Sequence, residues 1–185
     1  MCTAFSILQG LNRSKMDPIK WEALWNKGIR HMLFAIKLYR IQHDAGRFFL
    51  HEHPASASSW RLPEMQSLMD DLKIKKVNAH MCRFRMMSED AQGKGLVKKP
   101  TGFLTNSDFV RQSLDKQCLG GHRHVQLMGG RAKACQVYPE KLVRAILSGI
   151  RLELSNNGMI ALVHTDILGI DAEDEAMSHF DGQFV

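Results

Sequence analysis

Apolar residues recur every three or four positions between Asp17 and Gly46, which predicts one long helix. Asp17 can cap its first turn, Pro18 suits the first helical position, and Gly46 supplies a C-terminal stop. The apolar face is wide, so we expect the helix to pack against a sheet. Four residues widen it: Phe34, Ala35, Leu38 and Ile41.

Shorter patterns downstream predict strands that alternate with helices. Residues 47–52 form an apolar run between Gly46 and Pro54, typical of a strand buried on both sides in a parallel sheet. The polar, glycine-containing stretch 88–99 predicts a surface loop. Five more elements are expected: a helix from Pro63, strands at 75–82 and 102–106, a helix at 108–118 capped by Ser107, and a helix from Pro139.

This alternation indicates an α/β protein, a three-layer sandwich with a mostly parallel sheet. At 185 residues the chain is long enough for one domain with a buried core. We expect that domain to occupy residues 1–155 and an acidic tail to follow at 156–185. An unpaired sheet edge would favour a homo-oligomer or a partner chain.

Charge is distributed unevenly along the chain. Residues 166–185 hold six acidic side chains and no Lys or Arg, so residues 1–165 carry 25 basic against 13 acidic side chains. A basic body suits nucleic acid, although a basic face can also simply be solvated. Trp60 could stack on a base or lie in the core. Six basic residues fall in expected loops, where they could contact phosphates: Lys94, Lys98, Lys99, Arg123, Arg131 and Lys133.

Composition excludes several protein classes. Hydrophobic residues make up 44% of the chain, and no run approaches the roughly 20 apolar residues of a membrane span. The N-terminus lacks the pattern of a signal peptide, so we expect an intracellular protein of the nucleus or cytoplasm. Its four cysteines are then reduced thiols.

The order of motifs resembles the core of DNA cytosine-5 methyltransferases. Cys2 precedes the long helix, and the following strand ends in Glu52-His53-Pro54, as the catalytic cysteine and the glutamate signature do in that family. The segments 81–85 and 98–101 resemble its later arginine-bearing motif. Methyltransferase-like segments of retroelement polyproteins resemble the chain from Cys2 to about Leu154, including 118–124 and 138–142.

The resemblance implies a partial Rossmann-like methyltransferase fold and a role for each matching residue. Cys2 would be the nucleophile that attacks a flipped cytosine, Glu52 would contact the ring nitrogen, and Arg83 or Arg85 would support them. The family's methyl donor, S-adenosylmethionine, binds a glycine-rich loop upstream of the cysteine, but here only Met1 precedes Cys2.

We therefore expect a truncated, inactive relative derived from a mobile element that retains nucleic-acid binding. The alternative is an active S-adenosylmethionine-dependent methyltransferase completed by an upstream segment or another chain.

A third interpretation is a small zinc-binding or purely structural interaction module. Cys118, His122 and His124 are closely spaced and offer thiolate and imidazole ligands, which suit zinc. Cys82 or Cys135 could complete a set of four. A helix end followed by a Gly-Gly loop explains the same cysteine without metal.

Overall fold

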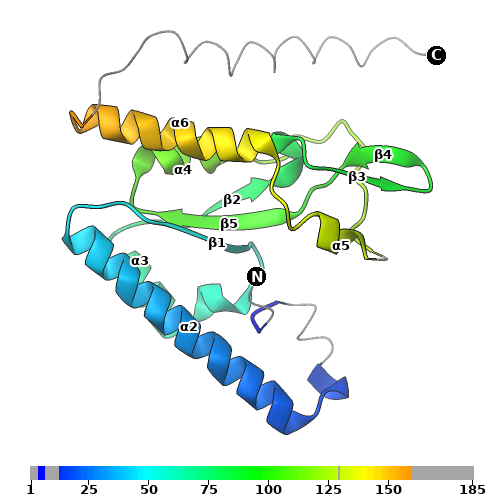
Figure 1. Cartoon of the computed structure of the whole chain (residues 1–185), viewed down its shortest axis with the longest axis horizontal. Coiled ribbons are helices and arrows are strands. Elements are labelled where there is room, and N and C mark those ends of the chain that lie inside the picture. The colour runs from blue at the N-terminus through cyan, green and yellow to red at the C-terminus, as the bar shows by residue number, and fades with distance from the viewer. Residues whose placement is uncertain (1–3, 7–12, 129, 160–185) are drawn as a thin grey trace. The chain divides into compact units, whose positions relative to one another are not determined.

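The computed structural model of the chain describes residues 4–6, 13–128 and 130–159. Three strands form a sheet in the order β1 (Leu50–Pro54), β5 (Pro100–Thr105), β2 (Val77–His80). A separate hairpin pairs β3 (Met87–Asp90) with β4 (Gly93–Leu96) (Figure 1). The α-helices of the described residues are α2 (Pro18–Asp44), α3 (Pro63–Asp71), α4 (Asp108–Leu114), α5 (Arg131–Ala134) and α6 (Glu140–Asn156).

The expected α/β architecture is confirmed, but the mostly parallel, Rossmann-like sheet is wrong. β5 pairs antiparallel with both neighbours, and Phe103 lies opposite Glu52 of β1 and Val77 of β2. β1 and β2 therefore run parallel to each other, joined through α3, with β5 inserted between them. Apolar periodicity predicts that a segment is a strand and carries no information on its direction, which explains the error.

A hairpin replaces the surface loop expected at 88–99. β3 and β4 pair from Met87 opposite Leu96 to Asp90 opposite Gly93. Gly93 has a φ of 90°, and Asp90 Oδ1 accepts a hydrogen bond of 2.9 Å from the Gln92 amide, so the two-residue turn is locally stabilised. The hairpin is largely exposed, and the sequence therefore lacks the alternation that would have predicted it.

β1 begins three residues later than expected and includes Pro54, which lies opposite Thr101. β1 is an edge strand, where a residue without an amide hydrogen is tolerated. Its side chains alternate between buried and half-buried, so it is not buried on both faces. Asn106 holds the segment that leads into β1. Its side chain accepts a hydrogen bond from the Phe49 amide and donates one to the Arg47 carbonyl, both of 2.9 Å.

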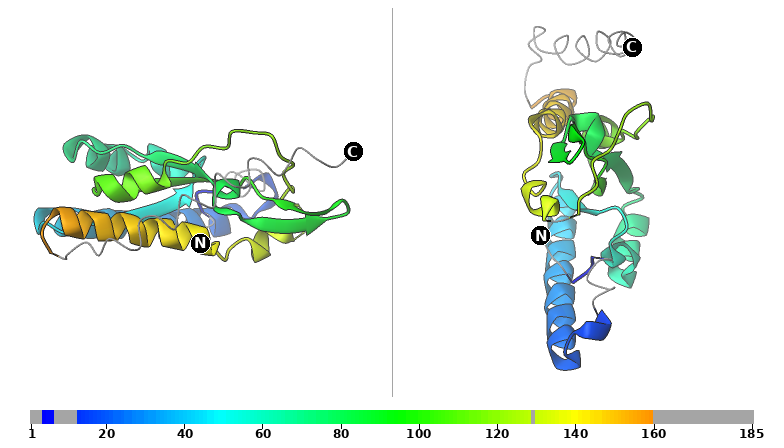
Figure 2. Two further views of the ribbon diagram at one scale, coloured as in Figure 1. Left: turned by 90° about the horizontal axis from the view of Figure 1, so that it is seen from above. Right: turned by 90° about the vertical axis from the view of Figure 1, so that its right-hand side faces the viewer.

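Helices cover both faces of the sheet, giving three layers (Figures 1 and 2). β5 is the central strand, and its consecutive residues Phe103 and Leu104 are both fully buried but belong to different core clusters. The Phe103 cluster contains Val77 and Ala79 of β2, Val110 and Leu114 of α4, and Leu142 of α6. The Leu104 cluster contains Met32 and Ile36 of α2, Trp60, and Met65 and Leu68 of α3.

α4 and α6 are joined by a buried polar contact. Ser107 caps α4 as expected, accepting from the Val110 amide, and its hydroxyl donates to Glu153 Oε2 at 2.6 Å. Gly149 lets the helices approach closely, because a Cβ there would lie 2.7 Å from Val110 Cα. Glu153 closes one compact unit of the chain and Leu154 begins a second, of which residues 160–185 lie outside the described part.

The long helix and its Asp17 cap are confirmed, since Asp17 Oδ1 accepts from the Ile19 amide at 2.8 Å. None of the described helices is long and apolar enough to cross a membrane. The helix packs against the sheet as expected, through buried Met32 and Ile36, but three of the residues that widen its apolar face are exposed. These are Phe34, Leu38 and Ile41.

Two histidines of β1 are buried on the face that α2 covers. His51 Nδ1 lies 2.9 Å from the Tyr39 hydroxyl, and His53 Nδ1 lies 2.6 Å from Ser59 Oγ. Within the described residues, His51 Nε2 has no hydrogen-bond partner. Burial, reinforced by neighbouring His53, lowers the pKa of His51 to about 3, and burial also lowers the pKa of His53. Both rings therefore remain neutral in the folded protein at neutral pH.

We predict that acid destabilises the protein through His51. Between the ordinary pKa of about 6.5 and the folded value, the unfolded chain binds a proton that the folded chain cannot, so the free energy of unfolding falls as pH falls. The expected loss is about 2 kcal/mol between pH 6.5 and pH 5, measured by urea unfolding. His51→Asn should flatten this dependence, and His31→Gln, on an exposed part of α2, should leave it unchanged. Equal slopes in all three proteins would contradict the prediction.

Candidate metal centre

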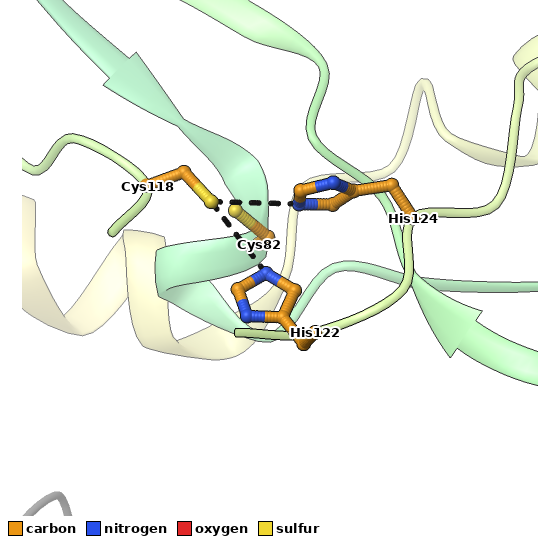
Figure 3. A group of neighbouring side chains, drawn as sticks. All are labelled: Cys82, Cys118, His122 and His124. Atoms are coloured by element: carbon orange, nitrogen blue, oxygen red, sulfur yellow. Dashed lines mark hydrogen bonds between the residues drawn. The ribbon is translucent and has the colours of Figure 1, made fainter. Parts of the chain in front are cut away.

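Four side chains converge beside the hairpin: Cys82, Cys118, His122 and His124 (Figure 3). Their ligand atoms all lie within 4.8 Å of one another. Cys118 Sγ is 3.6 Å from Nε2 of both histidines. Three of the four are the residues that the sequence predicted as ligands, and Cys82 is one of the two candidates for the fourth.

Cys82 is placed by the chain reversal that follows β2. The short 3-10 helix η3 (Met81–Phe84) begins directly after the strand, and the Met81 amide donates to the Lys98 carbonyl at 2.7 Å. Arg85 ends the turn in a left-handed conformation with a φ of 60°. Met81 and Phe84 are buried in the core, so Cys82 between them is only 4% exposed and its thiol is held firmly.

Cys118 lies in an extended segment and not at a helix end. α4 ends at Leu114, four residues earlier than expected. The segment runs alongside the end of β2, where the His80 amide donates to the Lys116 carbonyl at 3.0 Å and the Cys118 amide donates to His80 Nδ1 at 2.8 Å. The sequence interpretation missed His80 as a positioning residue, although its place two residues before Cys82 was a signal.

Two consecutive glycines turn the chain after Cys118, so that His122 and His124 lie beside it. Gly120 and Gly121 have φ values of 84° and 76°, a left-handed pair that side-chain-bearing residues adopt only under strain. The Gly120 amide also donates to Cys118 Sγ at 3.4 Å. His124 then forms an isolated parallel bridge with Leu96 of β4. Extended backbone alternates its side chains, which explains why His122 and His124 share one side.

Arg123, between the two histidines, points away from the ligands and binds the hairpin. Its guanidinium donates twice to the Asp90 carboxylate, at 2.8 and 2.9 Å. It also donates to the carbonyls of Gly93 and Lys94, at 2.9 and 3.1 Å. One residue of the ligand loop therefore fixes the loop to the hairpin turn, with Nη1 donating to the carboxylate and Nη2 donating to the two carbonyls.

The surroundings of His124 favour its neutral imidazole, and those of Cys82 favour its protonated thiol. Burial, helped by His122 and Lys98, lowers the pKa of His124. Burial, followed by the neighbouring Cys118, raises the pKa of Cys82 to about 11. Neutral imidazole is the form that binds metals, and a bound cation would displace the thiol proton.

Two of the spacings in the cluster match those of a tetrahedral metal site. Bonds of about 2.3 Å to sulfur and about 2.0–2.1 Å to nitrogen place ligand atoms of the two kinds about 3.6 Å apart. Both sulfur–nitrogen distances from Cys118 have this value. All four donors are thiol or imidazole groups, so the arrangement can bind a borderline-soft divalent cation without an oxygen ligand.

Cys135, the other candidate for the fourth ligand, belongs to the hydrophobic core. Its carbonyl accepts a hydrogen bond of 2.8 Å from Lys99 Nζ. The same ammonium lies 4.3 Å from the centre of the Tyr138 ring. Cys135 is therefore a buried structural thiol that can serve as a control for the cluster.

The residues predicted from the methyltransferase resemblance are only partly described. Cys2 lies outside the described residues, so its separation from Glu52 is not defined. Glu52 is half-buried within β1 and lies near Lys99. Burial, followed by the nearby Glu52, raises the pKa of Tyr138. Arg83 and Arg85 are exposed in the turn that carries Cys82.

The six basic residues predicted to contact phosphates fall into two groups. Lys94, Lys98 and Lys133 are exposed. The other three make internal contacts: Lys99 and Arg123 as described, and Arg131 by donating to the carbonyls of Glu89 and Met128. Trp60 is buried in the core, so it does not present a surface for stacking.

Compared with known proteins, the chain matches no family model, no curated protein and no solved structure. The arguments for function therefore come from the site itself.

We predict that Arg123→Gln loosens the ligand loop. Two backbone carbonyls lose a charged donor, which should lower the free energy of unfolding by about 1 kcal/mol. Thermal melting measures this effect. Arg111→Gln is the matched control, because Arg111 forms an exposed ion pair with Asp108 within one helix, and its loss should leave the melting temperature nearly unchanged. An Arg123 variant as stable as the control would show that the loop is held by other contacts.

Proposed function

We propose that this protein is a zinc-stabilised nucleic-acid-binding domain. The observation that carries the proposal is the convergence of Cys82, Cys118, His122 and His124 on one point, with sulfur–nitrogen separations of 3.6 Å. Cys82 lies more than thirty residues before the segment that carries the other three ligands, so the fold is what completes the set of four.

The donor set favours zinc among the common cations. Calcium and magnesium prefer oxygen ligands, whereas zinc accepts two thiolates and two imidazoles in a tetrahedron. Four protein ligands leave no position for water or substrate, which favours a structural role over a catalytic one. When bound, zinc would join the η3 turn to the loop that follows α4.

Nucleic acid is the partner that the surface around this centre favours. Residues 81–135 contain ten Lys or Arg side chains against four Asp or Glu, and Lys94, Lys98 and Lys133 among them are exposed. Lys98 is close enough to His80 and His124 to lower the pKa of each, after the larger effect of burial, so an exposed ammonium borders the ligands. Arg83 is exposed beside Cys82. The sequence resemblance to cytosine methyltransferases favours the same class of partner.

Zinc binding is tested by metal content and stability. The protein folded with zinc should hold one ion per chain, and free zinc at a thousand times its Kd should stabilise the fold by about 4 kcal/mol. Cys118→Ser should lose the ion, and Cys135→Ser should keep it. Replacement of zinc by cobalt gives a second measurement, because tetrahedral thiolate ligation produces visible absorption. A wild-type chain that binds neither ion would refute the zinc site.

Nucleic-acid binding is tested by its salt dependence. Each phosphate contact contributes about one unit to the slope of log affinity against log salt, so Lys94→Ala combined with Lys98→Ala should reduce that slope by about two. Fluorescence anisotropy with a labelled oligonucleotide, single-stranded or duplex, measures it. Lys20→Ala, on the exposed first turn of α2, is the control and should change nothing. Affinity that does not change between about 50 and 200 mM salt would refute the proposal.

A further inference from the structure

The outer face of α2 carries an apolar stripe that the fold does not use. Phe34, Leu38 and Ile41 are 63%, 42% and 47% exposed. Their spacing of four and then three residues places them on one side of the helix, away from buried Met32 and Ile36. A stripe at these intervals is the form in which one helix presents an apolar seam to another.

A preformed groove adjoins this stripe between α2 and α3. It encloses about 450 Å³ and is lined by Leu33, Ile36, Lys37 and Arg40 of α2 and by Pro63, Glu64 and Ser67 of α3. Leu33 is partly exposed, so the groove and the stripe occupy neighbouring sides of the same helix.

One wall of the groove is fixed by Arg40. Its guanidinium donates to Asp71 Oδ2 at 2.7 Å and to Ser67 Oγ at 3.1 Å, both on α3. Because this pair of contacts holds α3 against α2, the groove exists before any partner arrives. A preformed site loses less conformational entropy on binding than one that must first be assembled.

The charges around the stripe and the groove indicate which kind of partner would bind there. Between Glu22 and Asp44 of α2 there are four Lys or Arg residues and no Asp or Glu. The α3 side of the groove contributes the acidic Glu64, and its Asp71 pairs with Arg40, so the excess positive charge lies on the α2 side. Two copies that met through the α2 side would repel each other, which disfavours self-association through it. A flat lipid surface would leave the groove unfilled. An acidic side chain beside an apolar seam would satisfy both features. The four basic residues are Lys27, Arg30, Lys37 and Arg40.

We propose that the α2–α3 face docks an acidic amphipathic helix of a partner protein. Its apolar positions would lie along Phe34, Leu38 and Ile41 and enter the groove beside Leu33, while its acidic residues would face Lys27, Arg30 and Lys37. Phe34 and Ile41 are seven positions apart, a rise of about 10.5 Å along the helix, which two turns of a partner helix would cover. This activity goes beyond nucleic-acid binding and uses none of the residues of the metal centre.

The test uses the full chain and a fluorescein-labelled synthetic peptide of about five helical turns, with Leu at positions i, i+3, i+4 and i+7 and Glu at most others. One reference peptide has the same composition in scrambled order, and another has Lys in place of Glu. Fluorescence anisotropy should show the acidic amphipathic peptide binding at least tenfold more tightly than either reference. Equal binding of all three peptides, or none by the acidic one, would overturn the proposal.

Variants locate the surface. Phe34→Asp and Lys37→Glu should each weaken peptide binding at least tenfold. Ile19→Asp is the control, because Ile19 is 78% exposed on the same helix but lies outside the groove. Exposed positions should tolerate these changes, and unchanged melting temperatures verify that the variants fold. Binding that survives Phe34→Asp would place the peptide elsewhere and refute the assignment.

Two further outcomes would replace the proposed partner with another. The chain can instead be tested with phosphatidylserine vesicles. Vesicle binding that Phe34→Asp abolishes, without displacement of the peptide, would identify a lipid surface as the partner. A concentration-dependent dimer in sedimentation that Phe34→Asp abolishes would identify a second copy of the chain. Failure of the peptide test leaves the zinc and oligonucleotide predictions untouched, because those depend on other residues.

Discussion

The structure depends on a reversal of the chain between His80 and Pro100. β5 is the central strand, buried along five of its six residues, and it must lie antiparallel between β1 and β2. The chain leaving β2 therefore has to turn back within twenty residues. The η3 turn and the hairpin make this return, and Cys82 lies at its beginning. The position of the candidate metal centre follows from the topology of the sheet.

The hydrophobic core fixes one candidate ligand, whereas the other three lie on a loop. Met81, Phe84 and Met86 are buried around Cys82, so the first thiol is placed by hydrophobic packing. His122 and His124 lie on a segment held by the bridge to Leu96, the hydrogen bond from the Val125 amide to the Leu96 carbonyl, the burial of Val125 and the Arg123 contacts. Neither histidine is itself buried, so a cation bound to all four ligands would supply stability that these two side chains do not obtain from burial. This division explains why a structural ion suits the region.

The sequence predicted the elements whose signal is local. Capping residues and the 3.6-residue period located α2, α3 and α6 within a few residues, because those interactions lie within one helix. The direction of β5 could not be predicted, since it depends on pairing between segments distant in sequence. The apolar width of α2 was predicted, but periodicity cannot say whether a sheet or another protein covers Phe34. The hairpin was missed because few of its residues are buried.

The candidate site was predicted in composition but not in arrangement. Close spacing identified Cys118, His122 and His124, whereas the choice of Cys82 over Cys135 required knowledge of which thiol the reversal brings to them. The basic residues of the sequence predicted the exposed surface less well than the spacing of Cys and His predicted the candidate metal ligands. The sequence predicted that Arg123 and Arg131 contact phosphates, but both guanidinium groups donate to carbonyls within the protein. Arg123 also donates to a carboxylate. Arginine offers several donors in a fixed geometry and so often braces loops, whereas a lysine beside it more readily remains available to phosphate. The exposed ammonium groups of Lys94 and Lys98 therefore define the surface on which the proposed nucleic-acid binding would depend.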